Sequence, residues 1–379
     1  MHIDQYNGFR IGDIMKKSLF ALAIASAFTG TAYAQSSVTI YGIADTGIVK
    51  ETGSDVQMGN NHESRIGFRG TEDLGNGYKA LFMIEKRINL NDGTNLGEVD
   101  WDGGANVGIS GPFGMVRLGR VDEIPTETIR KLDPFDNDSI ANMPYSTQRS
   151  SRISNTIRYD SPNLSGLVLT GTYSLGKNTR NSDAGNAFVQ AGADNDGYAA
   201  AAVYDNGPIT LLGAWSRLTD SNDSYRWDVG GAYSWGNLRL SLAYERTKDK
   251  GWYNGGKSNS GIADSTLING VAATMNSWIV GLNYKLGPGT LKASFNYVKL
   301  KDVNGVDAAN GGNYWSDNSS ADLKQYGLGY IYDLSKRTSI YGILAYTDFE
   351  NQAISNFFRG AGYNNDSVTG VQLGITHKF

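Results

Sequence analysis

The sequence predicts an all-β protein that crosses a membrane as a 16-stranded, antiparallel, up-and-down β-barrel. Three observations predict this fold class. Apolar and polar residues alternate along most of the chain, and the alternating segments are joined by short turns and long loops in succession. An export leader precedes the first of these segments. Alternation with a period of two indicates strands, and short connections at one end with long ones at the other are typical of a transmembrane barrel.

The N-terminal segment has the three parts of a secretory signal peptide. From Met15 it begins with two lysines, continues with an apolar run over residues 19–28, and ends in the small residues around Ala34. The apolar run is too short to cross a bilayer as a helix. We therefore expect residues 1–34 to be a leader cleaved after Ala34, and residues 35–379 to form one barrel domain. A buried N-terminal helix is the less favoured alternative.

The composition excludes several classes of protein. The formal net charge of −4 argues against a nucleic-acid binder. The chain has no cysteine, so an exported form depends on packing or on closure of a sheet rather than on disulfides. With 48 glycines, 22 tyrosines and 7 tryptophans against 7 prolines, the composition indicates many strands and tight turns rather than disorder.

Each predicted strand carries one apolar face and one polar or small face. The stretch YRWDVGGAYSW, residues 225–235, places Tyr225, Trp227 and Val229 on one side and Arg226 and Asp228 on the other, and residues 238–247 and 277–286 repeat the pattern. The same alternation predicts strands at 38–50, 62–73, 78–90, 102–111, 114–121, 152–160, 166–175, 196–205, 209–219, 225–235, 238–248, 274–286, 290–300, 322–333, 337–349 and 367–379.

The connections between these strands alternate in length. Short turns rich in Gly, Pro and Asn, such as EDLGNG and DNGP, take turns with polar loops near 51–61, 91–101, 122–151, 176–195, 220–224, 249–273, 301–321 and 350–366. Six aromatic residues stand next to the short turns and predict an interfacial girdle, where an amphipathic ring meets lipid headgroups: Tyr159, Tyr204, Trp235, Tyr284, Tyr332 and Tyr341.

A soluble, secreted β-sandwich or propeller is the alternative fold. A sandwich of this length normally divides into domains of about 100 residues, and the sequence contains no linker. A propeller requires an internal repeat, and none is visible. The barrel is therefore the favoured interpretation.

The stretch HESRIGFRGTED, residues 62–73, shows what a barrel implies for charge. Because lipid cannot satisfy open backbone groups, the sheet must close and one face must look inward. Sixteen strands enclose an aqueous channel. We expect Glu63, Arg65 and Arg69 to face this lumen, and Ile66 and Phe68 to face lipid or a neighbouring subunit.

Several segments carry a resemblance to a known family. They are SVTIYGIADTG (37–47), SRIGFRGTEDLGNGYKALFMIE (64–85), GMVRLGR (114–120), NTIRYDSPNLSGL (155–167), YIYDLSKRTSIYGILAY (330–346) and TGVQLGITHKF (369–379). The chain resembles the Gram-negative general porins of the betaproteobacterial and neisserial type, from its first strand to its last. The resemblance implies a trimeric outer-membrane protein that passively passes ions and small hydrophilic solutes, with a weak preference for anions.

The resemblance also implies a constriction inside the barrel. In such porins the long third loop folds into the pore, where its carboxylates face arginines on the wall. Segment by segment, the wall residues are Arg65, Arg120 and Arg152. The loop, residues 122–151, offers Asp122, Glu123 and Glu127 as well as the three carboxylates that we select as the constriction set, which are Asp133, Asp136 and Asp138. Glu63, Arg69, Glu85 and Arg87 are expected to be further lumen charges, and Arg158 an ordinary solvated one.

The expected partners follow from the same resemblance. They are two further copies of the chain, outer-membrane lipids and lipopolysaccharide, the barrel assembly machinery, and the permeating solutes, with no nucleic acid. The C-terminal aromatic residue, Phe379, is similar to the signal that the assembly machinery reads. No cofactor is expected.

An enzymatic function has little support in the sequence. The mature chain has two histidines, His62 and His377, and neither is part of a nucleophile motif such as G-x-S-x-G. Cys/His clusters of the metal-binding kind are absent, so we expect no metal site. We therefore predict that the protein is not an enzyme. A substrate-specific channel and, with less support, an outer-membrane barrel hydrolase remain the alternative functions.

Overall fold

The structure is a computed structural model of the whole chain. It describes residues 37–96, 100–135, 139–143, 152–175, 196–217, 225–249, 273–301, 305–307, 312–315, 320–351, 354–355, 359 and 365–379. The expected leader, residues 1–34, lies outside the described residues, as do Asp136 and Asp138. In the part that is described, no helix has the length and apolar character that crossing a membrane requires.

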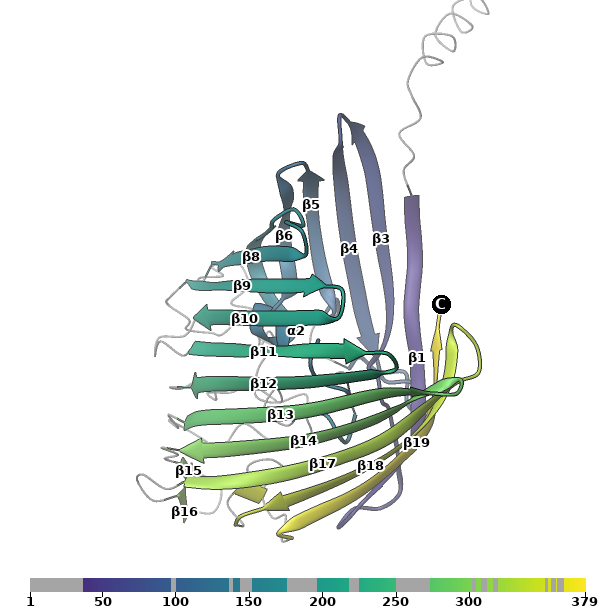
Figure 1. Cartoon of the computed structure of the whole chain (residues 1–379), viewed down its shortest axis with the longest axis vertical. Coiled ribbons are helices and arrows are strands. Elements are labelled where there is room, and N and C mark those ends of the chain that lie inside the picture. Colours follow the sequence, from purple (N-terminus) through teal and green to yellow (C-terminus); the bar gives the residue numbers. More distant parts are fainter. Residues whose placement is uncertain are drawn as a thin grey trace, which may run out of the picture.

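Sixteen antiparallel strands form one closed wall (Figure 1). They are β1 (Ser37–Glu51), β3 (Ser64–Gly75), β4 (Tyr78–Ile88), β5 (Gly104–Gly111), β6 (Gly114–Asp122), β7 (Arg152–Asp160), β8 (Leu167–Ser174), β9 (Gly197–Asn206), β10 (Ile209–Arg217), β11 (Tyr225–Trp235), β12 (Leu238–Asp249), β13 (Ala273–Leu286), β14 (Gly289–Lys301), β17 (Ser320–Asp333), β18 (Thr338–Phe349) and β19 (Ser367–Lys378). The predicted fold class is confirmed, and every predicted strand lies within two residues of an observed one.

The barrel closes where the last strand meets the first. β1 pairs with β3 over its first half and with β19 over its second, from Ile43 opposite Lys378 to Glu51 opposite Gly370. Gly42 and Phe379 exchange two backbone hydrogen bonds, of 3.0 and 3.1 Å. Every strand of the wall therefore has two neighbours, and no edge remains open among the described strands.

The two ends of the barrel differ in their connections. At the short-turn end, the β3–β4 hairpin turns through Gly75, Asn76 and Gly77, all with positive φ, which Gly and Asn adopt most readily. At the opposite end, the long-loop end, the connections are the longer polar segments. The short strands β2 (Gln57–Gly59), β15 (Gly305–Asp307) and β16 (Gly312–Trp315) also lie in these loops and were not predicted.

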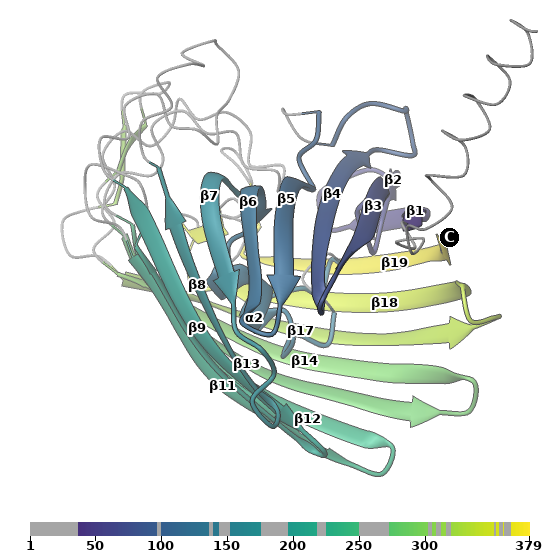
Figure 2. The same ribbon diagram turned by 90° about the horizontal axis from the view of Figure 1, so that it is seen from above.

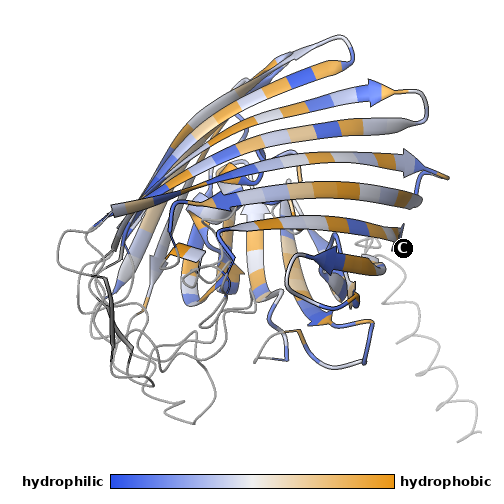
Figure 3. Cartoon of the chain, turned by 90° about the horizontal axis from the view of Figure 1, so that it is seen from below, coloured by the Kyte–Doolittle hydropathy of each residue, from blue (hydrophilic) through white to orange (hydrophobic). Residues whose placement is uncertain are grey.

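Hydrophilic and hydrophobic residues alternate along the strands (Figure 3), and successive side chains of a strand face opposite sides of the wall. Leu240, Leu242 and Leu373 are among the exposed outward residues, whereas the inward Ser241 and Gln372 are buried. One member of the predicted girdle is wrong: Tyr341 points inward and is buried, because the outward residues of β18 have even numbers. Its hydroxyl donates a hydrogen bond of 2.9 Å to the Asp45 carboxylate on β1.

A short helix lies inside the ring of strands (Figures 1 and 2). This helix, α2 (Ile124–Ile129), belongs to the long connection between β6 and β7 and contacts β9, β10 and β11. Glu123 caps its first turn by accepting the Thr126 N–H at 2.8 Å, and Pro125 occupies that same turn, where a missing N–H costs nothing. This helix was not predicted from the sequence.

Candidate functional site

A row of arginines crosses the inner wall from β3 to β7. Arg65 on β3 stands directly opposite Arg87 on β4. Arg120, at the end of β6, donates to the Asp102 carbonyl at 3.1 Å, and Arg152, at the start of β7, donates to the Gly103 carbonyl at 2.9 Å. The backbone N–H of Arg87 donates to the Asp102 carboxylate at 3.0 Å. The segment at residues 102–103 thus joins the β3–β4 half of the row to the β6–β7 half.

Carboxylates between the arginines hold the row in place. Glu85 lies 3.8 Å from the Arg65 guanidinium and 3.5 Å from that of Arg87, and Asp122 lies 2.8 Å from that of Arg152. Glu63 pairs with Arg87. Carboxylates and guanidinium groups are nearly equal in number along the row. Ion pairs and hydrogen bonds on both sides fix the orientation of the guanidinium groups.

Two further groups complete this wall. Arg69 lies four residues closer to the short-turn end of β3 than Arg65, with its guanidinium 5.0 Å above the Tyr41 ring. The Tyr41 hydroxyl in turn donates to Glu85 at 3.2 Å. Burial raises the pKa of the Asp102 carboxyl, and the hydrogen bond from the Arg87 N–H and the neighbouring guanidinium groups offset this only in part. The three predicted wall arginines and the four predicted lumen charges therefore lie on one continuous surface.

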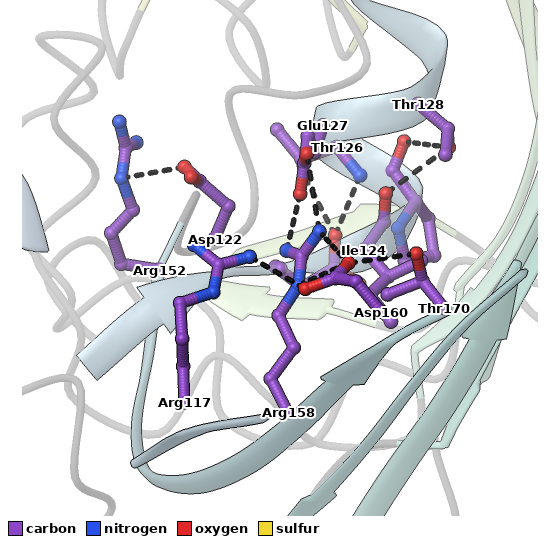
Figure 4. Close-up of polar contacts among 12 residues, drawn as sticks. Arg117, Asp122, Ile124, Thr126, Glu127, Thr128, Arg152, Arg158, Asp160 and Thr170 are labelled. Atoms are coloured by element: carbon purple, nitrogen blue, oxygen red, sulfur yellow. Dashed lines mark hydrogen bonds and ion pairs between the residues drawn. The ribbon is translucent and has the colours of Figure 1, made fainter. Parts of the chain in front are cut away.

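A second charged cluster lies closer to the short-turn end and includes a residue of the inner helix (Figure 4). Glu127 on α2 forms an ion pair with Arg158 on β7. Arg158 also binds Asp160 at 2.8 Å, and Asp160 accepts from Arg117 on β6 at 2.9 Å. A fifth group, the Thr170 hydroxyl on β8, donates to Asp160 at 3.0 Å. Here a carboxylate of the loop directly faces arginines of the wall.

Other carboxylates of the loop were predicted for this role. The Asp133 carboxylate accepts the backbone N–H groups of Phe135 at 2.9 Å and Met143 at 3.0 Å, so these bonds hold its own loop together. Asp136 and Asp138 lie outside the described residues. Among the described carboxylates of the loop, Glu127 is the one that joins α2 to Arg158, which we expected to be an ordinary lumen charge.

A buried ionic network fixes the other side of α2 to the wall. Glu123 accepts hydrogen bonds from Arg226 on β11 at 3.2 Å and from the Ser216 hydroxyl on β10 at 2.9 Å. Arg226, whose side chain is 0% exposed, also pairs with Glu245 on β12. Thr128, one turn along the helix, donates to Asp228 at 3.3 Å. The helix is thus held between Arg158 of β7 and the polar and charged groups of β10–β12.

The loop continues along the inner wall after α2. The Ser241 hydroxyl on β12 donates to the Leu132 carbonyl at 2.6 Å, and the side chain of Gln325 on β17 donates to the Ile140 carbonyl at 3.3 Å. The Ile140 N–H donates to Gln372 on β19 at 3.3 Å. Apolar residues of the loop are buried against the same strands, so its described part lines the wall from β10 to β19.

A closed barrel of sixteen strands with charged groups on its inner wall is the architecture of a membrane channel. A family model described as Gram-negative porin matches residues 21–352. The chain belongs to the Gram-negative porin family. The predicted family and the predicted outer-membrane localisation are therefore confirmed.

Individual relatives are similar to this porin in sequence over their whole length. It is 31% identical to an outer membrane porin protein of Bordetella pertussis, over 96% of this chain and 100% of that one. It is 29% identical to the major outer membrane protein P.IB of Neisseria meningitidis serogroup B, with the same coverage of both chains. The solved structure of an anion-selective porin from Comamonas acidovorans is 26% identical, with a TM-score of 0.69 over 91% of this chain and 100% of that one.

The comparisons also decide between the functions considered from the sequence. The relatives are channel proteins, so this porin is a general diffusion channel of the outer membrane and not an enzyme, as predicted.

Proposed function

We propose that this porin passes small hydrophilic anions in weak preference to cations, and that the constriction lies between α2 and the wall of β3–β7. The observation that carries the proposal is the row of Arg65, Arg87, Arg120 and Arg152 on that wall, together with the pairing of Glu127 with Arg158. Guanidinium groups stay charged at every accessible pH. Charges of opposite sign across a narrow gap produce a transverse field that selects among ions.

The preference is expected to be weak because carboxylates nearly match the arginines in number. Glu63, Glu85 and Asp122 each pair with a guanidinium of the row, which reduces its net field. Arg69 adds positive charge on the approach from the short-turn end. Similarity to a porin described as anion-selective supports the same sign of preference.

Double substitution of Arg65→Gln and Arg152→Gln tests the proposal. We expect the anion-to-cation permeability ratio to fall by roughly two- to fivefold, because one charge at about 4 Å in a water-like medium is worth about 1 kcal/mol. The reversal potential of planar bilayers under a salt gradient measures this ratio. Glu127→Gln removes a negative charge from the other side of the gap, so it should move the potential in the opposite direction.

The control removes two positive charges from the outer wall, with Lys299→Gln and Lys301→Gln. This variant should keep the reversal potential of the unmodified porin. An unchanged potential in the Arg65/Arg152 variant, or shifts of the same sign in all three variants, would contradict the proposed constriction.

We further propose that three copies assemble in the membrane, surrounded by outer-membrane lipids and lipopolysaccharide. The outward face of β19, β1 and β3 supports a contact between copies, since it presents small and aliphatic residues such as Gly42, Ala44 and Leu373. The C-terminal residue Phe379 is proposed as the element that the assembly machinery reads, and its ring is half-exposed on the outer wall. Native mass spectrometry of detergent extracts would show a trimer, and a monomer alone would contradict it.

A further inference from the structure

The outer wall carries a ladder of aromatic rings near the long-loop end. Trp227 on β11 contacts Tyr244 on β12 with ring centroids 5.1 Å apart. The next contacts are Tyr244 with Trp278 on β13 at 5.0 Å and Trp278 with Tyr297 on β14 at 5.3 Å. Four rings on four adjacent strands therefore form one band at the level where hydrocarbon meets lipid headgroups.

Basic side chains stand directly above this band, on the same face. In one row Arg246 on β12 is opposite Asn276, which is opposite Lys299 on β14; in the next row Lys248 and Lys301 stand on either side of Thr274. Neighbouring strands are about 4.8 Å apart, so the cations of β12 and β14 lie about 10 Å apart across β13. We name Arg246, Lys248, Lys299 and Lys301 the outer basic patch.

Polar contacts shape the floor of this patch. Asn276, between the two strands, accepts from the Tyr244 hydroxyl at 2.7 Å and from Arg246 at 3.5 Å. The nearest carboxylate on β17, Asp322, stands opposite Lys299 and accepts from the Tyr297 hydroxyl at 2.8 Å. A second carboxylate, that of Glu350, accepts the Asp322 N–H at 2.8 Å. Two carboxylates beside four cations leave the patch positively charged.

The outer wall on the other side of the barrel differs. Its cations at the same end are Lys50 on β1 and Lys86 on β4, which stand alone on their strands. The Lys86 ammonium pairs with Asp100 at 3.1 Å, and that of Lys50 donates to the Ser54 carbonyl. One aromatic residue, Phe68 on β3, stands in the row next to Lys86, opposite Ile84. Ring contacts also occur on β9–β10, between Tyr198 and Trp215, and on β17–β18, between Tyr326 and Tyr346, but the cluster of four cations stands on β12 and β14.

We propose that the outer basic patch binds the phosphate groups of a phosphorylated glycolipid in the outer leaflet. Long loops of outer-membrane barrels face the cell exterior, so this end of the wall lies in the outer leaflet. Phosphate is bound strongly by clustered Arg and Lys side chains. The sugar rings and acyl chains of the same glycolipid would pack against the aromatic ladder below the patch. The inference deepens the lipid partner proposed above and does not depend on the ion preference of the pore.

Binding of purified lipid A to the refolded porin in detergent micelles tests this assignment. We expect the variant Arg246→Gln, Lys248→Gln, Lys299→Gln, Lys301→Gln to bind diphosphorylated lipid A at least tenfold more weakly than the unmodified porin, as measured by native mass spectrometry. The matched control, Lys50→Gln with Lys86→Gln, should bind as tightly as the unmodified porin. A charge-preserving variant, Lys248→Arg with Lys299→Arg and Lys301→Arg, should also bind fully, which confirms that charge and not the lysine side chain is required.

Two further ligands separate the alternatives. Equal binding of dephosphorylated lipid A would overturn the role of phosphate, and equal binding of phosphatidylglycerol would overturn the assignment to a glycolipid. Undiminished binding by the fourfold variant would overturn the location. Conductance and reversal potential of the same samples should stay unchanged, because the patch lies outside the lumen. If the fourfold variant does not refold, Lys299→Gln with Lys301→Gln should show an intermediate loss, and full binding by that pair would overturn the proposal.

Discussion

At the scale of single residues, the inner wall depends on side chains that reach past the neighbouring strand to the next one. Tyr341 on β18 is the clearest case, since its hydroxyl reaches Asp45 on β1. The buried Asp45 carboxylate also accepts the Asn61 N–H at 2.8 Å and the Thr376 hydroxyl. Gly374 on β19 makes room for this contact, because a Cβ at that position would collide with the Tyr341 hydroxyl. Three strands and the loop after β1 are thereby tied together.

Tyr341→Phe is expected to lower the free energy of unfolding by about 1–3 kcal/mol, since a hydrogen bond to a buried charged group contributes about that much. Urea unfolding of the porin in lipid vesicles measures it. Tyr346→Phe, on the outward face of the same strand, is the matched control and should be nearly neutral. Equal effects of the two substitutions would show that the bond to Asp45 does not stabilise the barrel.

Individual residues differ in how far their positions and partners could be predicted from the sequence. Arg65 and Arg152 could be assigned to the wall because they stand in strands whose inward face is fixed by alternation. The partner of Arg158 could not be assigned, because Glu127 is brought to it by the path of a loop that has no period. Tyr341 was misplaced because its nearness to a short turn was weighed above its parity, and a shift by one residue reverses the face.

At the scale of elements, α2 is the piece that alternation could not predict. A helix of six residues is shorter than two turns and has no measurable apolar period. Its only local signals are Glu123 at the cap, Pro125 in the first turn and Glu127 near the positive end of the helix. Its position depends on Arg226, which lies 103 residues farther along the chain than Glu123, and on Glu245, which pairs with Arg226.

Arg226→Met should release α2 from the wall. It leaves the buried carboxylates of Glu123 and Glu245 without their cation, which costs about 3–5 kcal/mol. We expect larger and noisier single-channel conductance, because the helix can then leave the lumen. Single-channel recording at constant voltage measures both properties.

The compensating variant Arg226→Met, Glu123→Gln, Glu245→Gln removes the whole network. Neutral replacement of all members of a buried ionic group is much better tolerated than removal of one partner. Quiet channels of normal size should therefore return in the triple variant. Quiet, normal channels in Arg226→Met alone would show that hydrogen bonds such as Ser241 to Leu132 are sufficient to hold the loop.

At the scale of the whole molecule, the strand pattern specifies the barrel because closure and alternation depend on each other. A sheet in lipid cannot have an open edge, so sixteen amphipathic strands with tight turns at one end form a closed barrel. The seam is the step that no single strand encodes. β1 divides its pairing between β3 and β19, and the change occurs at Gly42 and Ile43, next to Phe379.

Gly42 is expected to be required for closing this seam. A Cβ at position 42 would collide with the Arg65 carbonyl oxygen of β3 and with the Phe379 ring of the final residue. Gly42→Val should therefore reduce the yield of closed barrel several-fold when the porin refolds into vesicles. Electrophoretic mobility without heating separates the closed form from the open one. Ala44→Val, on the same outward face and two residues farther along β1, is the matched control and should fold normally. If both variants close equally well, the contact of Phe379 with Gly42 is a consequence of closure and not a condition for it.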